Sequence, residues 1–514
     1  MDANPIVFNA DAEYGRIQIF TDVDYIDAKN VLELFMSAYE LHNRNAVKEE
    51  YLFGYERGKQ PIRNREKDVR PEINEKLVIN KASQIVDIHV GYCFGNPITY
   101  VQRGKVEEDL RKPSTSNDED NKYIAMINKM MAEQGKAKKD VQLARDYMIC
   151  GLGYQMVWKN DDKNQYSPFK IATLNPRTTF VVYKNDAFRE PIIAFSYIVH
   201  SNGSMTITGY TNDKCFVIRN YLSANESASV EETPNVLGMI PIVEFEHIDR
   251  MGVFEKVIDI LNGANVLNSD RINDVAQHVQ SLLWMHNCAV SEDKIETLTK
   301  MGVIATKSNG EGKDAKITYL SQVLDQSQVQ SFADFLYRQV EEITSTPSWQ
   351  EASGGSTTGA MQLSNGWQSL ELSAKSIEQN FAEPENRILR LVAKVIELDK
   401  RGYTRIKNID VSDIEPHFTR NKNYDLLSKT NALATMINTG VDGLWAFQTV
   451  GLFSDAEQAY VDSKKTIDAV QTKNTEKQNT NADKSADGKG GENNEPNAKV
   501  KESLQPSQLA QVED

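Results

Sequence analysis

The stretch NKASQIVDIHVGYCFGNPITY, residues 80–100, changes from a helical to an extended pattern within a few residues. It predicts a helix over residues 74–92, because Gly91 and the Asn-Pro pair that follows are residues that end helices and begin turns. The residues after the proline predict a strand over 98–102. A helix that leads directly into a strand indicates a domain that mixes α and β structure.

The rest of the first half carries both periodicities. Apolar residues recur at helical spacing over 25–55, and shorter helical patterns occupy 122–131 and 139–149. From residue 154 to 245 the period changes to two, in short β-type runs bounded by Gly, Pro, Asn and Asp. We therefore expect residues 1–253 to form an α+β part with an antiparallel meander, within a chain that is mainly helical.

The second half is predicted to begin with two helices around a small insert. Residues 254–286 fit one long helix, on the order of 50 Å at about 1.5 Å per residue. A small α/β insert over 287–324 separates it from a second helical stretch, 325–345. The second stretch places five apolar residues on one helical face: Val329, Phe332, Leu336, Val340 and Ile343.

A loop of small residues then precedes a third long helix. The loop is TPSWQEASGGSTTG, residues 346–359, and the helix is expected over 360–402. The apolar phase continues unbroken through Pro384, which favours one helix kinked at the proline. Short helices are expected within 403–470, and the composition of 471–514 is that of a disordered tail.

Composition and charge exclude several classes of protein. No stretch approaches the roughly 18 apolar residues of a membrane span, and the acidic start of the chain does not fit a signal peptide. Four widely spaced cysteines are expected to be reduced and mostly buried. The net charge of −15 argues against a tight non-specific DNA binder but is compatible with a protein that lets DNA slide past it.

The loop segment SGGSTTG, before a helix, is the one candidate for phosphate or acyl chemistry. It lacks the GK[ST] ending of a P-loop, and a threonine stands where a nucleophile elbow has serine, so a mobile loop with Ser/Thr caps is favoured. His278 and His286 lie eight residues apart with no HExxH motif. We therefore expect no catalytic residue, no metal, no cofactor and no enzymatic activity.

Basic residues gather in the small insert. They are Lys294, Lys300, Lys307, Lys313 and Lys316. Ordinary surface lysines and contacts to DNA phosphate or to an acidic partner are equally compatible with this pattern.

Three stretches resemble portal proteins of tailed bacteriophages, in the branch common in long-tailed phages of Gram-positive hosts. They are NKASQIVDIHVGYCFGNPITY at 80–100, the segment from STTGAMQL to SLE at 356–371, and FTRN at 418–421. The first is distinctive, and the likeness in layout covers about residues 25–470.

The resemblance implies a portal-type subunit made of successive parts. They are an α+β wing (1–253), a two-helix stem (254–286 and 325–345), a small clip (287–324), a tunnel loop (346–359), a long kinked helix (360–402), a helical crown (403–470) and the tail (471–514). In this family the tunnel loop faces DNA. That role would fall on Ser353, Gly354, Gly355, Ser356, Thr357, Thr358 and Gly359.

The resemblance also implies a ring of this chain, usually of twelve copies, at one capsid vertex of a virion assembled in the host cytoplasm. Double-stranded DNA would pass through it without sequence preference, driven by a separate motor because no Walker motif is present. Implied partners are the terminase large subunit, head-completion or adaptor proteins, scaffold and major capsid protein, with the clip lysines as contacts, and no membrane. The alternatives are a scaffolding or minor capsid protein and, less favoured, a nucleotide-binding enzyme.

Overall fold

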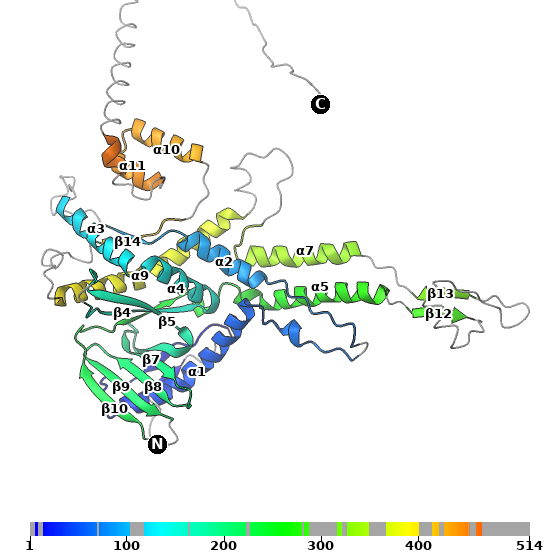
Figure 1. The fold of residues 1–514 in the computed structure, drawn as a ribbon, viewed down its shortest axis with the longest axis horizontal. Helices are drawn as coiled ribbons and strands as arrows, with labels where there is room; N and C mark the ends of the chain where they lie inside the picture. Colours follow the sequence, from blue (N-terminus) through cyan, green and yellow to red (C-terminus); the bar gives the residue numbers. More distant parts are fainter. Residues whose placement is uncertain are drawn as a thin grey trace, which may run out of the picture. The chain divides into compact units, whose positions relative to one another are not determined.

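The computed structural model describes residues 6–8, 14–68, 71–102, 118–162, 165–222, 227–279, 282–286, 316–320, 326–348, 366–399, 414–420, 426–450, 452 and 459–464. The chain divides into two compact units, residues 1–422 and 423–514. The first unit is a mixed α+β structure, as predicted (Figure 1). No helix in the described ranges is long and apolar enough to cross a bilayer.

Seven long helices lie in the described part of the first unit. They are α1 (Val31–Glu56), α2 (Lys81–Phe94), α3 (Asp118–Glu133), α4 (Lys136–Cys150), α5 (Ile258–Val279), α7 (Gln326–Ile343) and α9 (Trp367–Leu398). Short 3-10 turns occur at Pro61–Asn64, Pro176–Thr178, Ile248–Arg250 and Glu255–Val257.

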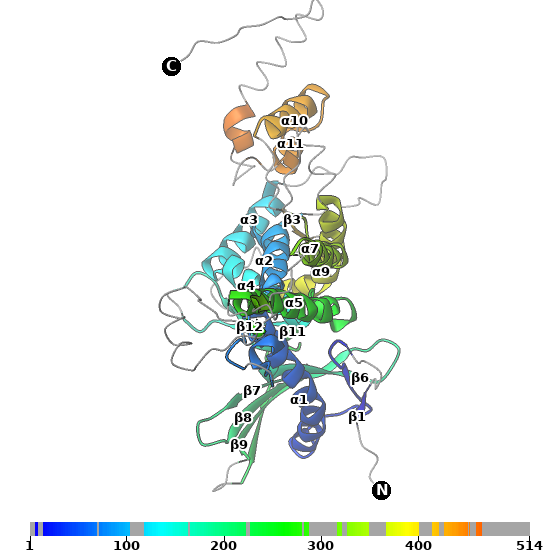
Figure 2. The ribbon, with the colours of Figure 1, turned by 90° about the vertical axis from the view of Figure 1, so that its right-hand side faces the viewer.

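The larger sheet has seven strands in the order β1-β2-β6-β7-β8-β9-β10. Its strands are β1 (Ile6–Phe8), β2 (Ile19–Thr21), β6 (Thr179–Lys184), β7 (Pro191–Val199), β8 (Met205–Tyr210), β9 (Lys214–Tyr221) and β10 (Ser229–Pro234). All neighbours are antiparallel except β2 and β6, so the predicted meander is confirmed over β6 to β10. Helix α1 lies against this sheet (Figure 2). Its Phe35 contacts the rings of Phe180 and Phe195.

A second core lies around a three-stranded antiparallel sheet and the helices α2, α4 and α9. Its strands are β11 (Ile242–Glu246), β4 (Leu152–Lys159) and β5 (Phe169–Leu174). Phe381 of α9 is at its centre, with ring centroids 4.7 Å from Phe94 and 4.5 Å from Phe245. Cys93, Cys150 and Cys215 are free and buried, as predicted for the cysteines, and Cys288 lies outside the described residues.

Two strand pairs complete the first unit. The predicted strand after the Asn-Pro pair is confirmed as β3 (Thr99–Gln102), which pairs with β14 (Ile414–His417). Strands β12 (Leu282–His286) and β13 (Lys316–Leu320) form an antiparallel ribbon.

Three boundaries differ from prediction. The expected helix 254–286 is wrong at its end, because α5 stops at Val279 and residues 282–286 form β12; a short apolar run such as LLWM fits a helix or a strand equally well. The helix expected from residue 74 begins at Lys81, because residues 74–80 are extended and their backbone bonds to side chains of α5. Helix α9 begins at Trp367 and runs unbroken through Pro384, while 360–365 lie outside the described residues.

The second unit contains a helix pair, α10 (Leu426–Asn438) and α11 (Gly443–Val450). The connection contains Gly440 at φ 87°, a left-handed conformation that glycine adopts without steric cost. The ring of Phe447 packs 5.9 Å from that of Tyr460.

Candidate functional site

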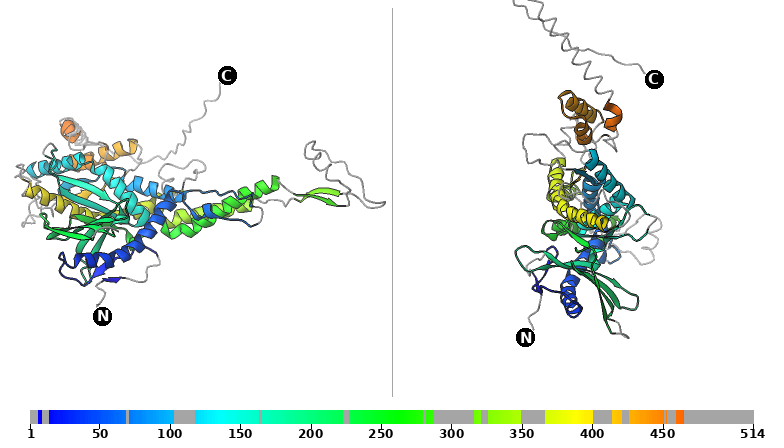
Figure 3. Two further views of the ribbon diagram at one scale, coloured as in Figure 1. Left: turned by 60° about the horizontal axis from the view of Figure 1, so that its bottom comes forward. Right: turned by 90° about the vertical axis from the view of Figure 1, so that its left-hand side faces the viewer.

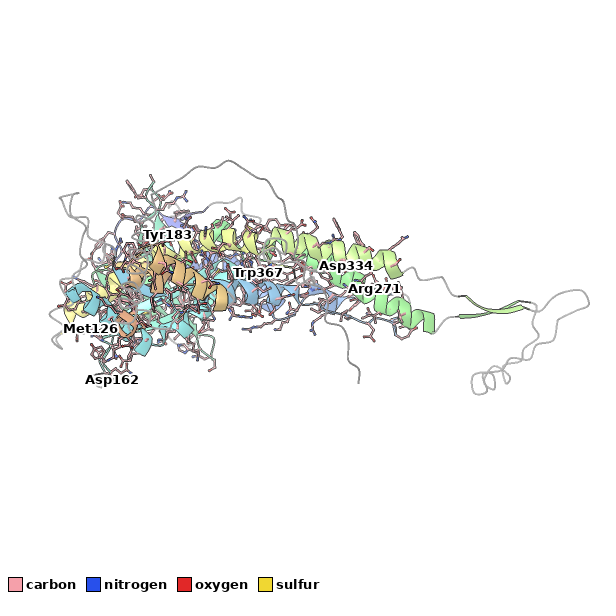
Figure 4. All side chains as sticks on the ribbon, turned by 90° about the horizontal axis from the view of Figure 1, so that it is seen from above. Met126, Asp162, Tyr183, Arg271, Asp334 and Trp367 are labelled. Carbon is pink, nitrogen blue, oxygen red and sulfur yellow. The ribbon has the colours of Figure 1, made fainter. Side chains whose placement is uncertain are left out.

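Helices α5 and α7 lie side by side and antiparallel, and they extend together away from the two cores of the first unit (Figure 3). Asn268 Nδ2 donates to the hydroxyl of Tyr337 at 2.9 Å, and Arg271 Nη1 donates to Gln330 Oε1 at 2.7 Å. Gln330 Nε2 also donates to Asp334 Oδ1 at 2.7 Å, and Figure 4 labels Arg271 on α5 and Asp334 on α7. Along the chain, strand β12 follows α5 and strand β13 precedes α7.

The base of α5 is fixed by a buried carboxylate. Glu255 accepts hydrogen bonds from the backbone N–H groups of Gly15 at 3.1 Å and Gly252 at 3.0 Å, and it forms an ion pair with the fully buried Arg16. A Cβ on Gly252 would lie 2.0 Å from the carbonyl oxygen of Ile149, so only glycine permits this close approach. The orientation of α5 is therefore set where it leaves the core.

An extended strap, residues 74–80, runs along α5 and is hydrogen-bonded to it by side chains. The backbone N–H of Ile79 donates to Asn265 Oδ1 at 3.0 Å, that of Leu77 to Ser269 Oγ at 2.9 Å, and that of Glu75 to Asn273 Oδ1 at 2.7 Å. Alternate residues of an extended chain are about 6.6 Å apart, and residues four apart in a helix about 6.0 Å. The spacing of the N–H donors along the strap therefore matches the spacing of the acceptor side chains along α5 over three successive hydrogen bonds.

This ladder explains why 74–80 is not helical. The three acceptor side chains are at most 2% exposed, and they supply the hydrogen bonds that a strand partner would otherwise provide. The observed helix α2 therefore differs from the predicted one at its start, where residues 74–80 are not helical. Asn80 caps α2, because its side chain accepts a hydrogen bond from the N–H of Ser83 at 3.4 Å.

Helix α2 contacts both flanks of the loop predicted at 346–359. His89 Nε2 donates to the carbonyl oxygen of Thr344 at 2.9 Å, and the hydroxyl of Tyr92 donates to Glu371 Oε2 at 2.5 Å. Burial lowers the pKa of His89, because it disfavours the charged imidazolium. The distinctive helix therefore holds the end of α7 and the start of α9 together.

The two ends of the loop meet. Gly366, at φ 82°, caps α9, and a Cβ built on it would lie 3.7 Å from the Cα of Pro347. Arg420, just after β14, adds ion pairs to Glu371 at 3.0 Å and to Glu378 at 2.5 Å. The described residues before and after this segment, Pro347 and Gly366, thus lie next to each other.

A buried ionic cluster joins α4 to the middle of α9. Lys136 Nζ lies 2.7 Å from Asp140 Oδ1 and 2.8 Å from Glu385 Oε1, and Tyr100 donates to the same oxygen of Glu385. Gln155 Nε2 donates to Asp140 Oδ1 at 3.2 Å. Although burial opposes a charge on Lys136, the carboxylates of Asp140 and Glu385 raise its pKa.

Most of the predicted site residues are not described by the structure. Ser353, Gly354, Gly355, Ser356, Thr357, Thr358 and Gly359 lie outside the described residues, as do Lys294, Lys300, Lys307 and Lys313. Lys316 is the first residue of β13 and pairs with His286 of β12.

Sequence reasoning missed the ladder and the contacts of His89. Polar residues at four-residue spacing, Asn265, Ser269 and Asn273, are the signal that could have indicated a polar partner along one face of α5. Nothing in the sequence identifies that partner as a segment almost 200 residues away.

The sequence profile of the family described as "Phage portal protein, SPP1 Gp6-like" matches residues 33–442. A search of curated proteins found no match. The matched range contains the α5–α7 pair, the β12–β13 ribbon, the strap, α2 and both flanks of the loop.

Proposed function

Because the chain belongs to the SPP1 Gp6-like family of phage portal proteins, we propose that its copies form a ring channel at one capsid vertex. Double-stranded DNA passes through this channel during packaging and ejection. The observation that carries the proposal is the α5–α7 pair, which leaves the core as a rigid two-helix arm joined to a β ribbon. Such an arm suits the wall of a pore built by many copies.

The parts of the subunit follow from this proposal. The stem is α5 and α7, and the clip is the ribbon with the residues between its strands, 287–315, so that it begins slightly earlier than expected. The wing comprises residues 1–253, and the crown lies within 403–470. The kinked helix of the proposal is α9.

The tunnel loop is residues 346–359, with Ser353 to Gly359 facing DNA. Small uncharged side chains make weak, exchangeable contacts to phosphate, which a sliding polymer requires. Support comes from the described residues on either side of the loop: His89 of α2 bonds to Thr344 before it, and Tyr92 of α2 bonds to Glu371 after it. The acidic balance of the chain, −15, limits the counterion release that would hold DNA in place.

The clip is proposed to dock the terminase large subunit and then the head-completion proteins, with Lys294, Lys300, Lys307, Lys313 and Lys316 as contacts to DNA or to these partners. The ring is proposed to have twelve copies, to meet scaffold and major capsid protein during assembly in the host cytoplasm, and to remain in the virion. The seven-stranded sheet disfavours the alternative of a coiled-coil scaffolding rod.

The proposal is tested in two steps. Electron microscopy of the purified full-length protein is expected to show rings with a central opening wide enough for a duplex. Deletion of Ser353 to Thr358 is expected to leave the rings intact and to reduce the fraction of DNA-filled heads in an infected or reconstituted system. A protein that stays monomeric would contradict the channel, and heads that fill normally after the deletion would contradict the tunnel-loop assignment.

A further inference from the structure

The turn that leads into α5 is held in an unfavourable backbone conformation. Asp249 and Arg250 have φ values of 57° and 53°, in the left-handed region that residues with a side chain rarely adopt. A Cβ on Gly15 would lie 2.4 Å from the carbonyl oxygen of Asp249. One on Gly151 would lie 2.5 Å from that of Arg250, so the turn is tightly enclosed. Residues in such conformations persist only where their surroundings hold them, and they cluster at sites that bind or switch.

The segment around Arg16 is bonded on one side to α1 and on the other to this turn and the base of α5. On the α1 side, the N–H of Ile17 donates to Asn45 Oδ1 and Asn45 Nδ2 donates to the carbonyl oxygen of Ile17, both at 2.8 Å. On the other side, the N–H of Arg16 donates to the carbonyl oxygen of Arg250 at 3.1 Å. The guanidinium group of Arg16 forms its ion pair with Glu255.

A second carboxylate, that of Glu49, lies on the same face of α1 as Asn45. It is four residues further along the helix and therefore one turn away. Glu49 is 1% exposed, and neither of its carboxylate oxygens accepts a hydrogen bond from the described residues. The side chain of Arg16 is 0% exposed, and its Nε and Nη1 atoms find no acceptor in the same part of the chain.

The two buried cations of this region already have carboxylate partners. Arg16 pairs with Glu255, and Arg250 Nη1 lies 2.7 Å from Glu244 Oε1. Glu49 is thus a surplus carboxylate. A buried carboxylate without a partner is unfavourable, and Glu49 gains one if a neighbouring guanidinium group moves to it.

We propose that this joint is a two-state switch, in which the guanidinium group of Arg16 passes from Glu255 to Glu49. In the second state the segment around Arg16 keeps its two bonds to Asn45 and releases the turn and the base of α5. Relaxation of the turn and the new ion pair offset the pair that is lost. The angle at which α5 leaves the core becomes adjustable, while its bonds to the strap and to α7 remain. The exchange takes place within one chain, so the inference does not depend on the proposed ring.

The exchange depends on pH, because it changes the surroundings of Glu49. Burial raises the pKa of Glu49 to about 7, although the charges of Arg16 and Arg250 oppose this rise. Pairing with Arg16 in the second state favours the ionised carboxylate, so there the proton is lost at lower pH. Between pH 6 and pH 8 the observed state loses this proton and the second state has none to lose. The population of the second state should therefore rise by about 10-fold over this range.

Other charged or titratable groups also act on Glu49 or feel its charge. They are Arg177, Glu244, Cys150, Tyr154 and Tyr197. Burial raises the pKa of Cys150, Tyr154 and Tyr197, so these three groups stay protonated between pH 6 and pH 8.

The first test is hydrogen exchange of the full-length protein at pH 6 and pH 8, resolved to single amides by mass spectrometry with fragmentation. The amides of Gly15 and Gly252, which donate to Glu255, should open about 10-fold more at pH 8 after correction for the intrinsic exchange rate. The amide of Ile17 keeps its bond to Asn45 and should show no such rise. An equal rise at Ile17 would mean that the whole segment detaches, and no rise at Gly15 would mean that the joint is static; either result would overturn the proposal.

The second test removes the titrating group. In Glu49→Gln, the opening of Gly15 and Gly252 should be the same at pH 6 and pH 8. Glu40→Gln, at a 76% exposed side chain of the same helix, is the matched control and should keep the 10-fold rise. A rise that persists in Glu49→Gln would assign the pH dependence to another group and refute the role of Glu49.

Discussion

Replacing Lys136 with methionine removes the single cation of a buried cluster. The side chains of Lys136 and Asp140 are each 4% exposed and that of Glu385 is 0% exposed. The lysine ammonium group contacts both oxygens of Asp140, at 2.7 and 2.9 Å, as well as Glu385. The variant leaves two buried carboxylates without the cation that lies between them.

The expected cost is about 3–5 kcal/mol of unfolding free energy, the range for breaking a buried ion pair by removing one partner. A chain of two units does not unfold in a single step, so the assay is differential scanning calorimetry, in which the transition of the first unit is followed. We expect this transition to fall by on the order of 3–6 °C, because the unfolding entropy of a unit of this size is about 0.9 kcal/mol/K. Lys138→Met, at an exposed lysine of the same helix, should shift it by less than about 1 °C.

The pH dependence gives the sharper test. Burial raises the pKa of Asp140 to about 6 even with Lys136 in place. A carboxyl whose pKa is raised on folding binds its proton more tightly in the folded state, so it destabilises increasingly as pH rises through that pKa. The decrease in melting temperature caused by Lys136→Met should therefore be largest at pH 8 and smaller at pH 5. An equal deficit at both values, or a shift no larger than that of Lys138→Met, would refute the reasoning.

Two further predictions concern single buried side chains. Ser269→Ala removes the acceptor of the Leu77 amide and should lower the local opening free energy by about 1–3 kcal/mol. The measurement is hydrogen exchange at Leu77, which should become faster. Exchange as slow as in the wild type would show that this hydrogen bond contributes nothing. Glu49 is 1% exposed with both carboxylate oxygens unpartnered, and burial raises its pKa to about 7, so it destabilises the fold as pH rises from about 4.5 through 7. Glu49→Gln should therefore melt higher than wild type at pH 8 and show little gain at pH 5, and a variant that melts no higher at pH 8 would argue against this.

Much of the fold could be predicted from local pattern. The strand after the Asn-Pro pair, the meander and the continuous helix through Pro384 all follow from periodicity and from turn residues. The errors occur where a segment distant in the sequence determines the local secondary structure. Residues 282–286 are a strand because they pair with 316–320, and residues 74–80 are extended because α5 supplies their hydrogen-bond acceptors.

The site was predictable to a smaller extent. The sequence indicated the α5–α7 pair, but not that α2 binds both flanks of the loop, since a buried histidine such as His89 looks like any core residue. The apolar stripe of α7 was visible as a pattern, yet the sequence does not distinguish an apolar side chain that is buried within the chain from one that is exposed. Val340 and Phe332 differ in this respect only in three dimensions.

The ladder between the strap and α5 fixes the rotation of this helix about its own axis. A helix held by one partner can rotate about its axis at little cost, because apolar contacts are non-directional. Three directional bonds from Asn265, Ser269 and Asn273 on one side, and the Asn268–Tyr337 bond on another, fix that rotation. The same rotation of α5 is therefore set in every copy, so that assembly of the proposed ring requires no rearrangement of this helix. A substitution in the strap ladder should accordingly weaken ring assembly, which light scattering of the full-length protein over a range of concentrations would detect.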